Sequence, residues 1–170
     1  AIPFFMLVGE LMNSSGITKR IFHFANCCVG HITGGLGHVN ILSSMLFAGM
    51  SGAAVADCAG LGAIEIKAMT EEGFDVDFSV GVTAASSIIG PIIPPSSPMV
   101  MFGIAAGVSI GSLFMGGITV GVIMGLFMMI TVYIISKKRK YPKHPRAKFG
   151  EISKAFFSAL PALLSPIILV

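Results

Sequence analysis

Hydrophobic residues dominate this chain in long runs, separated by short polar or glycine-rich stretches. The longest uncharged run extends from Phe78 to Ser136 and contains no Asp, Glu, Lys, Arg or His. One bilayer-spanning helix needs only ~20 predominantly apolar residues, so this run predicts more than one membrane segment. In its middle lies Gly-Pro-Ile-Ile-Pro-Pro-Ser-Ser-Pro at 90–98. This stretch cannot continue a helix, because proline lacks the N–H that closes a helical turn.

The proline-rich interruption divides the run into a broken membrane helix at 78–107. Half-helices are expected at 78–89 and 99–106, with the break between them. Non-helical backbone survives at membrane depth only where protein or a wet cavity satisfies its polar groups. Many transporters build solute and ion sites from such broken helices. The pattern therefore indicates a membrane transporter with its site at this break.

A second interruption comes earlier in the chain. The apolar stretch 39–47 spans only ~14 Å as a helix, too little to cross a hydrocarbon core of ~30 Å. Gly-Met-Ser-Gly at 49–52 follows it, and a second helix is expected over 53–69. Two short helices joined at a Gly/Ser tip predict a re-entrant hairpin at 34–77.

The two ends of this hairpin are expected to be polar or glycine-rich. Gly-Gly-Leu-Gly at 34–37 is interpreted as a loop before the first helix. The stretch from Glu65 to Asp77 is interpreted as the hydrophilic exit. A hairpin that does not cross the membrane returns this exit to the side from which the chain entered.

The remaining segments complete an all-α, polytopic membrane fold. Residues 17–29 are amphipathic at helical spacing, which suits either a helix in the membrane interface or an ordinary packed helix. Residues 154–170 begin a span that Pro161 and Pro166 are expected to interrupt. The predicted organisation is a membrane-helix end plus amphipathic helix at 1–33, the hairpin at 34–77, the broken helix at 78–107, a transmembrane helix at 108–136, a basic loop at 137–153 and the start of a further segment at 154–170.

Composition and charge support a membrane location and give an orientation. Hydrophobic residues make up 54% of the chain and charged residues 11%, against about 25% charged in soluble domains. Seven of the eleven Lys and Arg residues lie between 137 and 148, with no acid among them. Because this run abuts a membrane segment, it indicates a cytoplasmic anchor rather than a nucleic-acid-binding tail. Three cysteines without metal-ligand spacing predict neither a metal centre nor a disulfide framework.

The hairpin tip and the break are the candidate ion and substrate site. Both offer carbonyl and hydroxyl oxygens, which suit a hard cation such as Na⁺, and no other cofactor is expected. The candidate residues are Ser51, Gly52, Asp57, Ser86, Ser87, Gly90, Pro94, Pro95, Ser96 and Ser97, and the Na⁺ candidates among them are Ser51, Gly52, Gly90 and Ser96.

Two structural alternatives stay open at these positions. Asp57 is a functional candidate as an ionisable residue in a membrane segment, or it complements the positive N-terminal end of the second hairpin helix. For Ser43, Ser44, Ser86 and Ser87, the alternative to a role in the site is packing together with a bond to a carbonyl of the preceding turn.

An enzyme interpretation of the tip also has to be considered. Gly-Met-Ser-Gly at 49–52 matches the Gly-x-Ser-Gly nucleophile motif of rhomboid-type intramembrane proteases, with Ser51 as the nucleophile. A serine nucleophile needs a base within hydrogen-bond reach. In rhomboids that base is a His on a later membrane helix, whereas here His144 falls in the basic loop. The match therefore gives little support to a protease.

Several motifs carry a family resemblance over essentially the whole chain. They are IPFF at 2–5, GELM at 9–12, GGLG at 34–37, SGAAVAD at 51–57, TAASSIIGPIIPPS at 83–96 and GVSIG at 107–111. They resemble the large membrane (M, or DctM-like) subunit of TRAP transporters, the tripartite ATP-independent periplasmic transporters. The resemblance implies a Na⁺-driven, elevator-type importer of organic acids such as dicarboxylates, sialic acid or sugar acids.

The resemblance also implies an architecture and partners. The large subunit has two inverted repeats, and this chain matches most of the first, so we expect one half of an inverted repeat from a longer protein. The implied partners are a small membrane (Q) subunit, a periplasmic solute-binding protein, the organic acid and the lipid bilayer of the bacterial inner membrane, but no nucleic acid. Alternatives are a related ion-transporter-superfamily permease without a binding protein, and a truncated membrane piece with only a structural role.

Overall fold

All regular structure in the described residues, 16–52 and 54–169 of this computed structural model, is helical. The helices are α2 (Ile17–Val29), α3 (Gly35–Ser51), α4 (Ala54–Gly60), α5 (Gly62–Glu71), α6 (Val76–Ser87), α7 (Ser97–Ala106), α8 (Ile110–Arg139) and α9 (Phe149–Leu169). The expected all-α fold class is therefore confirmed for these residues. The re-entrant hairpin and the inverted repeat remain predictions.

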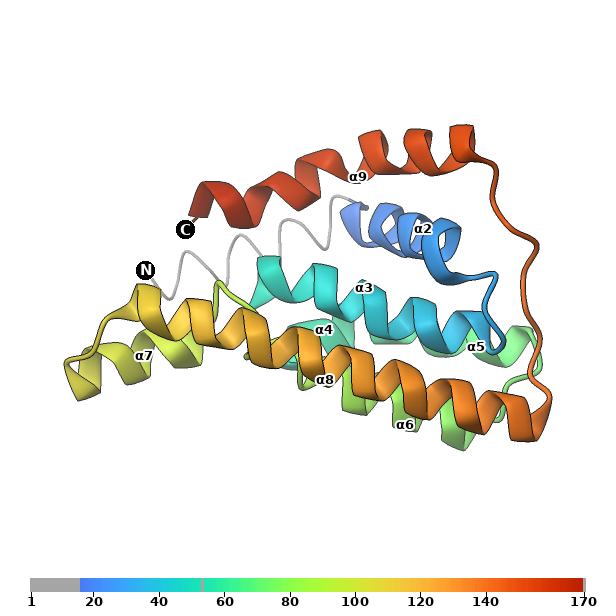
Figure 1. The fold of residues 1–170 in the computed structure, drawn as a ribbon, viewed down its shortest axis with the longest axis horizontal. Helices are drawn as coiled ribbons and strands as arrows, with labels where there is room; N and C mark the ends of the chain where they lie inside the picture. Colours follow the sequence, from blue (N-terminus) through green and yellow to red (C-terminus); the bar gives the residue numbers. More distant parts are fainter. Residues whose placement is uncertain (1–15, 53, 170) are drawn as a thin grey trace.

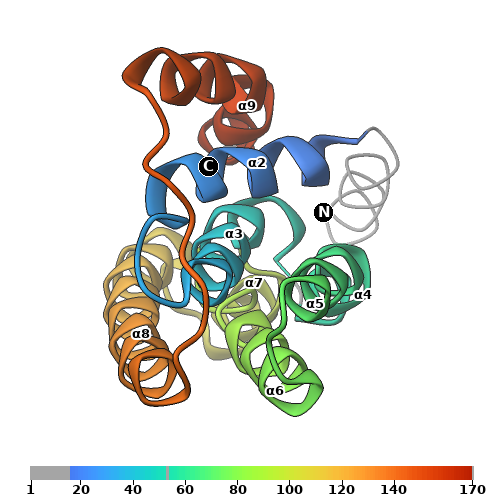
Figure 2. The ribbon, with the colours of Figure 1, turned by 90° about the vertical axis from the view of Figure 1, so that its right-hand side faces the viewer.

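Helix α3 lies at the centre of the bundle. In Figure 1, α3, α5, α6 and α8 run along the long axis of the molecule. Figure 2 looks along these axes and shows α3 surrounded by α2, α5, α6 and α8, while α2 runs across the bundle and α9 lies outside it. An antiparallel pair made of α3 on one side and α4 with α5 on the other is joined at Gly52, where the predicted hairpin tip lies.

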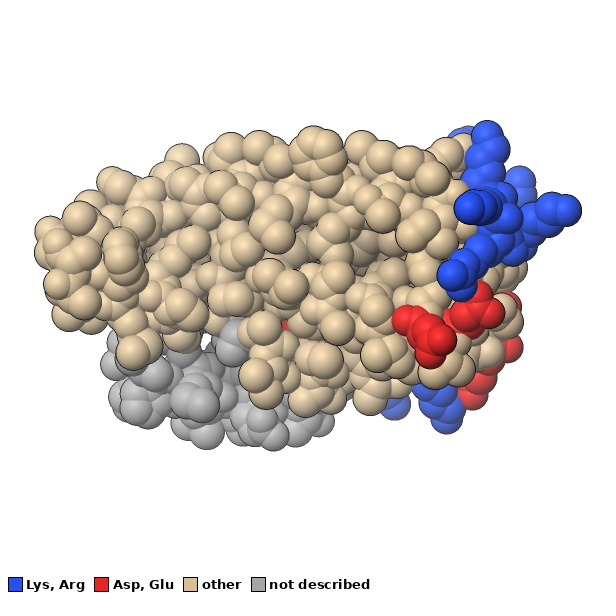
Figure 3. Space-filling model, turned by 90° about the horizontal axis from the view of Figure 1, so that it is seen from below, with Lys and Arg blue, Asp and Glu red and all other residues tan. Residues whose placement is uncertain are grey.

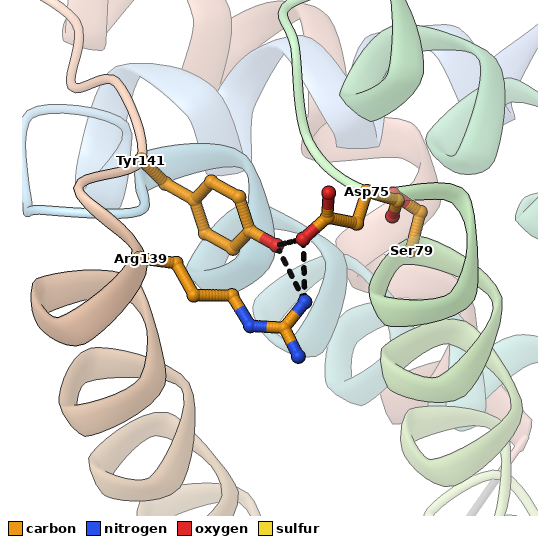
Figure 4. A network of polar contacts seen from close by, with 4 residues as sticks. All are labelled: Asp75, Ser79, Arg139 and Tyr141. Carbon is orange, nitrogen blue, oxygen red and sulfur yellow. Dashed lines mark hydrogen bonds and ion pairs between the residues drawn. The ribbon is translucent and has the colours of Figure 1, made fainter.

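The connection from α5 to α6 is tied to the end of α8. The rings of Phe74 and Phe78 pack on Tyr141 with centroid distances of 4.4 and 5.0 Å. Beside them, Asp75 Oδ2 accepts hydrogen bonds from the Tyr141 hydroxyl and the Arg139 guanidinium (Figure 4). These two bonds, the Tyr141 one foremost, hold the pKa of Asp75 below its usual value. The start of α6 and the end of α8 are thereby fixed together.

Charged side chains gather at this same end of the molecule. In the face shown in Figure 3, Lys, Arg, Asp and Glu cluster at one end, and the rest of that face is almost entirely uncharged. The basic loop lies against both other connections there: Gly34 N donates to Pro142 O at 3.2 Å, and His144 lies 2.7 Å from Glu72. The predicted topology requires these connections to share one side. That this side is the cytoplasm remains a prediction.

Helix α8 is the one helix in the described part of the chain that is long and apolar enough to cross a membrane. Its 30 residues extend over ~45 Å, and the mean hydropathy of its most apolar window is 2.4. Large hydrophobic side chains such as Met115, Phe127 and Ile134 are exposed on it. Such a surface needs lipid or another protein to cover it.

Three predictions about the hairpin were wrong. The glycines at 34–37 are not a loop, because only Gly34 has a positive φ, 76°, and α3 begins at Gly35. Helix α3 has 17 residues and is therefore ~25 Å long, so shortness does not exclude a crossing. The helix expected at 53–69 is also divided in two, with α4 ending at Gly60 and α5 beginning at Gly62.

Four further predictions concern the N-terminal and C-terminal parts of the chain. The basic loop is shorter than 137–153, because α8 continues to Arg139 and α9 begins at Phe149. Helix α9 runs through Pro161 and Pro166 without interruption. Helix α2 forms as expected and packs on α3 and α9, as an ordinary packed helix would. The membrane-helix end predicted near the N-terminus lies outside the described residues.

Candidate functional site

The hairpin tip and the proline-rich break meet at Gly52. This residue ends α3 with a φ of 58°, and its N–H donates to Ala48 O at 3.1 Å. A Cβ placed on Gly52 would lie 2.5 Å from Pro95 O and 3.4 Å from the Cα of Ser96. The two predicted interruptions, which lie far apart in the sequence, are therefore in backbone contact.

The break itself is a series of turns between α6 and α7. The N–H groups of Ile92 and Ile93 both donate to Ile89 O at 3.0 Å, and the Pro94–Pro95 peptide bond is cis. The Ser96 hydroxyl donates to Pro91 O at 2.5 Å and accepts from Met99 N at 3.3 Å. Ser96 is therefore the N-cap of α7, so its side chain stabilises the shape of the break.

A buried seam of polar side chains joins α3 to α6. Asn40 Nδ2 donates to Thr83 Oγ1 at 2.7 Å, and Asn40 Oδ1 lies 2.7 Å from Ser86 Oγ. Ser44 Oγ donates to Ser86 Oγ at 3.1 Å. Each of these side chains is at most 1% exposed. Since buried hydrogen bonds fix the relative positions of the groups that share them, the seam holds the hairpin against the broken helix.

Asp57 lies at the tip end of this seam. Its side chain is 1% exposed and belongs to the first turn of α4. The carboxylate faces the hydroxyls of Ser44 and Ser87, while its Oδ1 atom makes no hydrogen bond. An acceptor left unpaired in a buried site is costly, so this atom is available to a proton or a cation.

Most of the predicted site residues are brought together here. Gly52 contacts the Pro95–Ser96 backbone, Asp57 faces Ser87, and Ser86 belongs to the seam. Gly90 and Pro94 are buried within the same break, while Ser97 is half-buried at the start of α7. Ser51 is the last residue of α3, and its side chain lies outside the description.

Ser86 and Ser87 also make the bonds to the preceding helical turn that sequence analysis gave as an alternative to ion binding. Ser87 Oγ donates to Thr83 O at 2.8 Å, and Ser86 Oγ lies 3.0 Å from the same carbonyl. Ser86 therefore combines a bond to the preceding turn with its place in the seam.

Sequence analysis missed three members of the seam and misplaced one acid. Asn40, Ser44 and Thr83 were not assigned to the site, although Asn40 and Ser44 are one helical turn apart and could have been identified from that spacing. Glu65 was assigned to the hydrophilic exit, but its side chain is 1% exposed and both of its oxygens are unpaired. Burial of one face of α5 against α3 and α6 accounts for the difference.

Helix α8 supports the break from the other side. A Cβ on Gly117 would lie 2.4 Å from Ile92 O, and one on Gly121 would lie 2.4 Å from a side-chain carbon of Ile93. Both glycines are buried. The absence of side chains on this face of α8 therefore permits the break to approach its backbone.

The donor set of the site is made mainly of neutral oxygens. No group of three or more His, Cys, Asp and Glu side chains that could hold a metal ion is found in the described residues. Carbonyl and hydroxyl oxygens are hard ligands that suit alkali and alkaline-earth cations rather than zinc or copper. Neutral oxygens and one buried carboxylate, that of Asp57, are therefore the donor groups that the candidate site offers.

Comparisons with known proteins match the chain to one transporter family over its full length. A family model described as "Tripartite ATP-independent periplasmic transporter, DctM component" matches residues 1–170. The chain is 51% identical over 170 residues to the sialic acid TRAP transporter large permease protein SiaM of Vibrio cholerae. It is 49% identical to the sialic acid TRAP transporter permease protein SiaT of Haemophilus influenzae and 42% identical to the 2,3-diketo-L-gulonate TRAP transporter large permease protein YiaN of Escherichia coli, each over 170 residues.

All three matches cover 100% of this chain. They cover 40% of the Vibrio and Escherichia proteins and 28% of the Haemophilus protein. The chain thus spans less than half the length of these relatives. Each relative is named as a transporter permease, which leaves the protease interpretation of Ser51 without support.

Proposed function

Because the chain belongs to the DctM family of tripartite ATP-independent periplasmic transporters, we propose that it is part of a Na⁺-coupled permease for organic acids and supplies half of the ion and substrate site. The observation that carries this proposal is the backbone contact between Gly52 at the hairpin tip and Pro95 in the break. Interrupted helices that meet inside a bundle are how transporters hold ions and solutes with backbone groups.

The choice of Na⁺ rests on the chemistry of the donors. The break offers backbone carbonyls, and the neighbouring seam offers hydroxyls, with Asp57 as the adjacent negative charge. The Na⁺ ligands are proposed to be Ser51, Gly52, Gly90 and Ser96. Helix ends that point at the same place would attract the carboxylate of a substrate.

The substrate class follows from the relatives. Their names include sialic acid, 2,3-diketo-L-gulonate and C4-dicarboxylate, and each of these compounds carries at least one carboxylate. The proposed setting is a multi-pass protein of the bacterial inner membrane, with a small membrane subunit and a periplasmic solute-binding protein as partners. Movement of the hairpin and the broken helix as one unit would give elevator-type access to the two sides.

Uptake by the full-length permease subunit, reconstituted in liposomes with both partners, tests the proposal. Imposed Na⁺ gradients should drive uptake of a sialic acid or a C4-dicarboxylate, and removal of the binding protein should abolish it. Uptake without Na⁺ would contradict the coupling. Uptake without the binding protein would favour the related permease that works alone.

A double substitution, Pro94→Ala with Pro95→Ala, tests the location of the site. Alanines permit a helix to continue through the break, and its internal hydrogen bonds would occupy the carbonyls. We expect a higher half-saturating Na⁺ concentration or lost uptake. Ser96→Ala should act less strongly, because it removes a helix cap worth about 1 kcal/mol and leaves the prolines in place. Wild-type Na⁺ affinity in the double variant would place the ion site elsewhere.

A further inference from the structure

Glu65 is a buried acid that the proposed ion site does not use. Its side chain on α5 is 1% exposed, and neither carboxyl oxygen has a hydrogen-bond partner in the described part of the chain. It lies thirteen positions after Gly52 in the sequence, on the arm of the hairpin that leads back to the charged end. A polar group this deeply buried without a partner calls for an explanation.

The neighbours of Glu65 on α5 show which way this face of the helix points. Gly62, one turn earlier, is so close to α6 that a Cβ on it would lie 2.7 Å from Thr83 Cγ2. Met69, one turn later, has its sulfur 3.9 Å from Asn40 Nδ2. Glu65 therefore lies on the face of α5 that packs against the polar seam. Ser43 of α3, which is 0% exposed and also unpaired, belongs to the same region of the hairpin.

Among the residues that the structure describes, no cationic side chain neutralises Glu65. Helices α3, α4 and α6 pack against α5. Helix α4 contributes Asp57, whose charge acts on Glu65, and the exposed Cys58. Helix α3 contributes the buried His38, whose ring nitrogens make no hydrogen bond to any side chain. The buried polar side chains of α6 carry no charge, and Asp77 at its start is exposed.

Lys67, the basic residue of α5 itself, does not neutralise Glu65 either. Lys67 is directed to solvent, with its side chain 75% exposed and its Nζ 3.9 Å from Glu71. An isolated carboxylate in such surroundings is very unfavourable, and the usual outcome is that the group takes up a proton. A second acid nearby adds to this tendency, since like charges disfavour ionisation of both.

We propose that Glu65 is a proton-binding site inside the hairpin, and that its proton is exchanged with water during the transport cycle. Protonation turns the carboxylate into a carboxylic acid at one oxygen, and no other bond changes. The electrostatic interaction with Asp57 makes the proton on Glu65 sensitive to cation binding. A cation bound at the tip cancels the charge of Asp57, and the proton is then released from Glu65 more easily. This exchange rests on the Na⁺ site proposed above, whereas the bound proton itself does not.

Infrared difference spectroscopy on the full-length permease subunit, reconstituted with its partners, tests this directly. Spectra are recorded with and without Na⁺ at a series of pH values, for wild type, Glu65→Gln and the control Glu71→Gln. Glu71 ends the same helix and is 66% exposed at its side chain, so its loss should leave the buried carboxyl unchanged. We expect a protonated-carboxyl band in wild type and Glu71→Gln that Na⁺ and high pH diminish, and no such band in Glu65→Gln.

Labelling with ¹³C-glutamate assigns the band to a glutamate rather than to Asp57 without any substitution, which keeps the test valid if Glu65→Gln does not fold. Among the described residues, Glu65 is the buried glutamate. A band that does not shift with this label belongs to another group and overturns the proposal. A band that neither Na⁺ nor pH changes would mean a permanent proton and would also overturn it. Loss of one bound ²²Na⁺ in Glu65→Gln would make Glu65 a Na⁺ ligand instead.

The test of Na⁺ coupling and the test of the proton site can fail independently. Uptake that ignores Na⁺, together with a Glu65 band that still titrates with pH, would refute the function proposed above and leave the bound proton in place. Na⁺-dependent uptake without a protonated-carboxyl band in wild type would support the proposed function and refute the proton site at Glu65.

Discussion

At the scale of single residues, the absence of a side chain at Gly52 allows the hairpin tip to meet the break. The residue has a φ of 58°, a conformation that costs an L-amino acid roughly 1–2 kcal/mol. The atom that a Cβ would meet, at 2.5 Å, is a backbone oxygen. A flexible side chain could rotate away from such a contact, but a carbonyl between two turns cannot.

The first prediction is therefore that Gly52→Ala separates the tip from the break. We expect Na⁺-dependent uptake in the reconstituted full-length protein to fall by at least tenfold, the equivalent of about 1.4 kcal/mol, while membrane insertion is retained. Gly73→Ala is a matched control, because Gly73 also has a positive φ, 86°, but no atom lies within 4 Å of its missing Cβ. Equal losses in the two variants would assign the effect to backbone strain alone.

At the scale of helices, α8 supports the site through one glycine face and presents its other faces outwards. Gly117 is buried against the carbonyl of Ile92, whereas a Cβ on Gly116 would meet nothing within 4 Å. The two glycines are adjacent in one helix, so their intrinsic helix propensities are equal. Any difference between their alanine variants reports the contact with the break.

We predict that Gly117→Ala weakens Na⁺ binding and that Gly116→Ala does not. The first adds a methyl group where there is no room, at a cost of about 1–3 kcal/mol. The second should stabilise α8 by up to about 1 kcal/mol, because alanine favours a helix over glycine. Thermal unfolding together with the half-saturating Na⁺ concentration for uptake measures both effects. Unchanged Na⁺ affinity in Gly117→Ala would show that α8 does not shape the ion site.

Features that follow from local chemistry could be predicted at this scale, and features that follow from packing could not. The break was predictable because Pro91, Pro94 and Pro95 fall within five residues and together remove the N–H groups that successive helical turns need. Two prolines spaced more widely, Pro161 and Pro166, are accommodated in α9. The burial of Glu65 was not, because beside Lys67 it has the local pattern of a solvated turn. Its position depends on which face of α5 packs against α3 and α6, and that is decided by distant residues.

At the scale of the whole molecule, charge is concentrated at one end of an otherwise apolar bundle. The connections before α3, before α6 and after α8 all lie there and bond to one another. The turn between α7 and α8 lies at the opposite end, ~45 Å away along α8. Two positions at the ends of one helix can therefore report the orientation of the whole bundle.

We predict that the charged end faces the cytoplasm. In a full-length variant whose native cysteines are replaced, Val108→Cys should react with a membrane-impermeant maleimide in intact cells, because Val108 is 47% exposed near the opposite end. Lys138→Cys should react only after the membrane is permeabilised. The reverse pattern would overturn the orientation that the positive charges of the basic loop indicate.

The polar seam between α3 and α6 also has a consequence for synthesis. Asn40 and Ser44 leave the ribosome 43 and 42 residues before their partners Thr83 and Ser86. In lipid, an unsatisfied polar group costs several kcal/mol, so the newly made hairpin is poorly suited to enter the bilayer alone. We therefore expect α3, α4 and α5 to stay with the insertion machinery until α6 has been translated, so that the hairpin and the broken helix enter the bilayer as one unit. A translational pause before Thr83 would then leave the polar side chains of α3 without their partners.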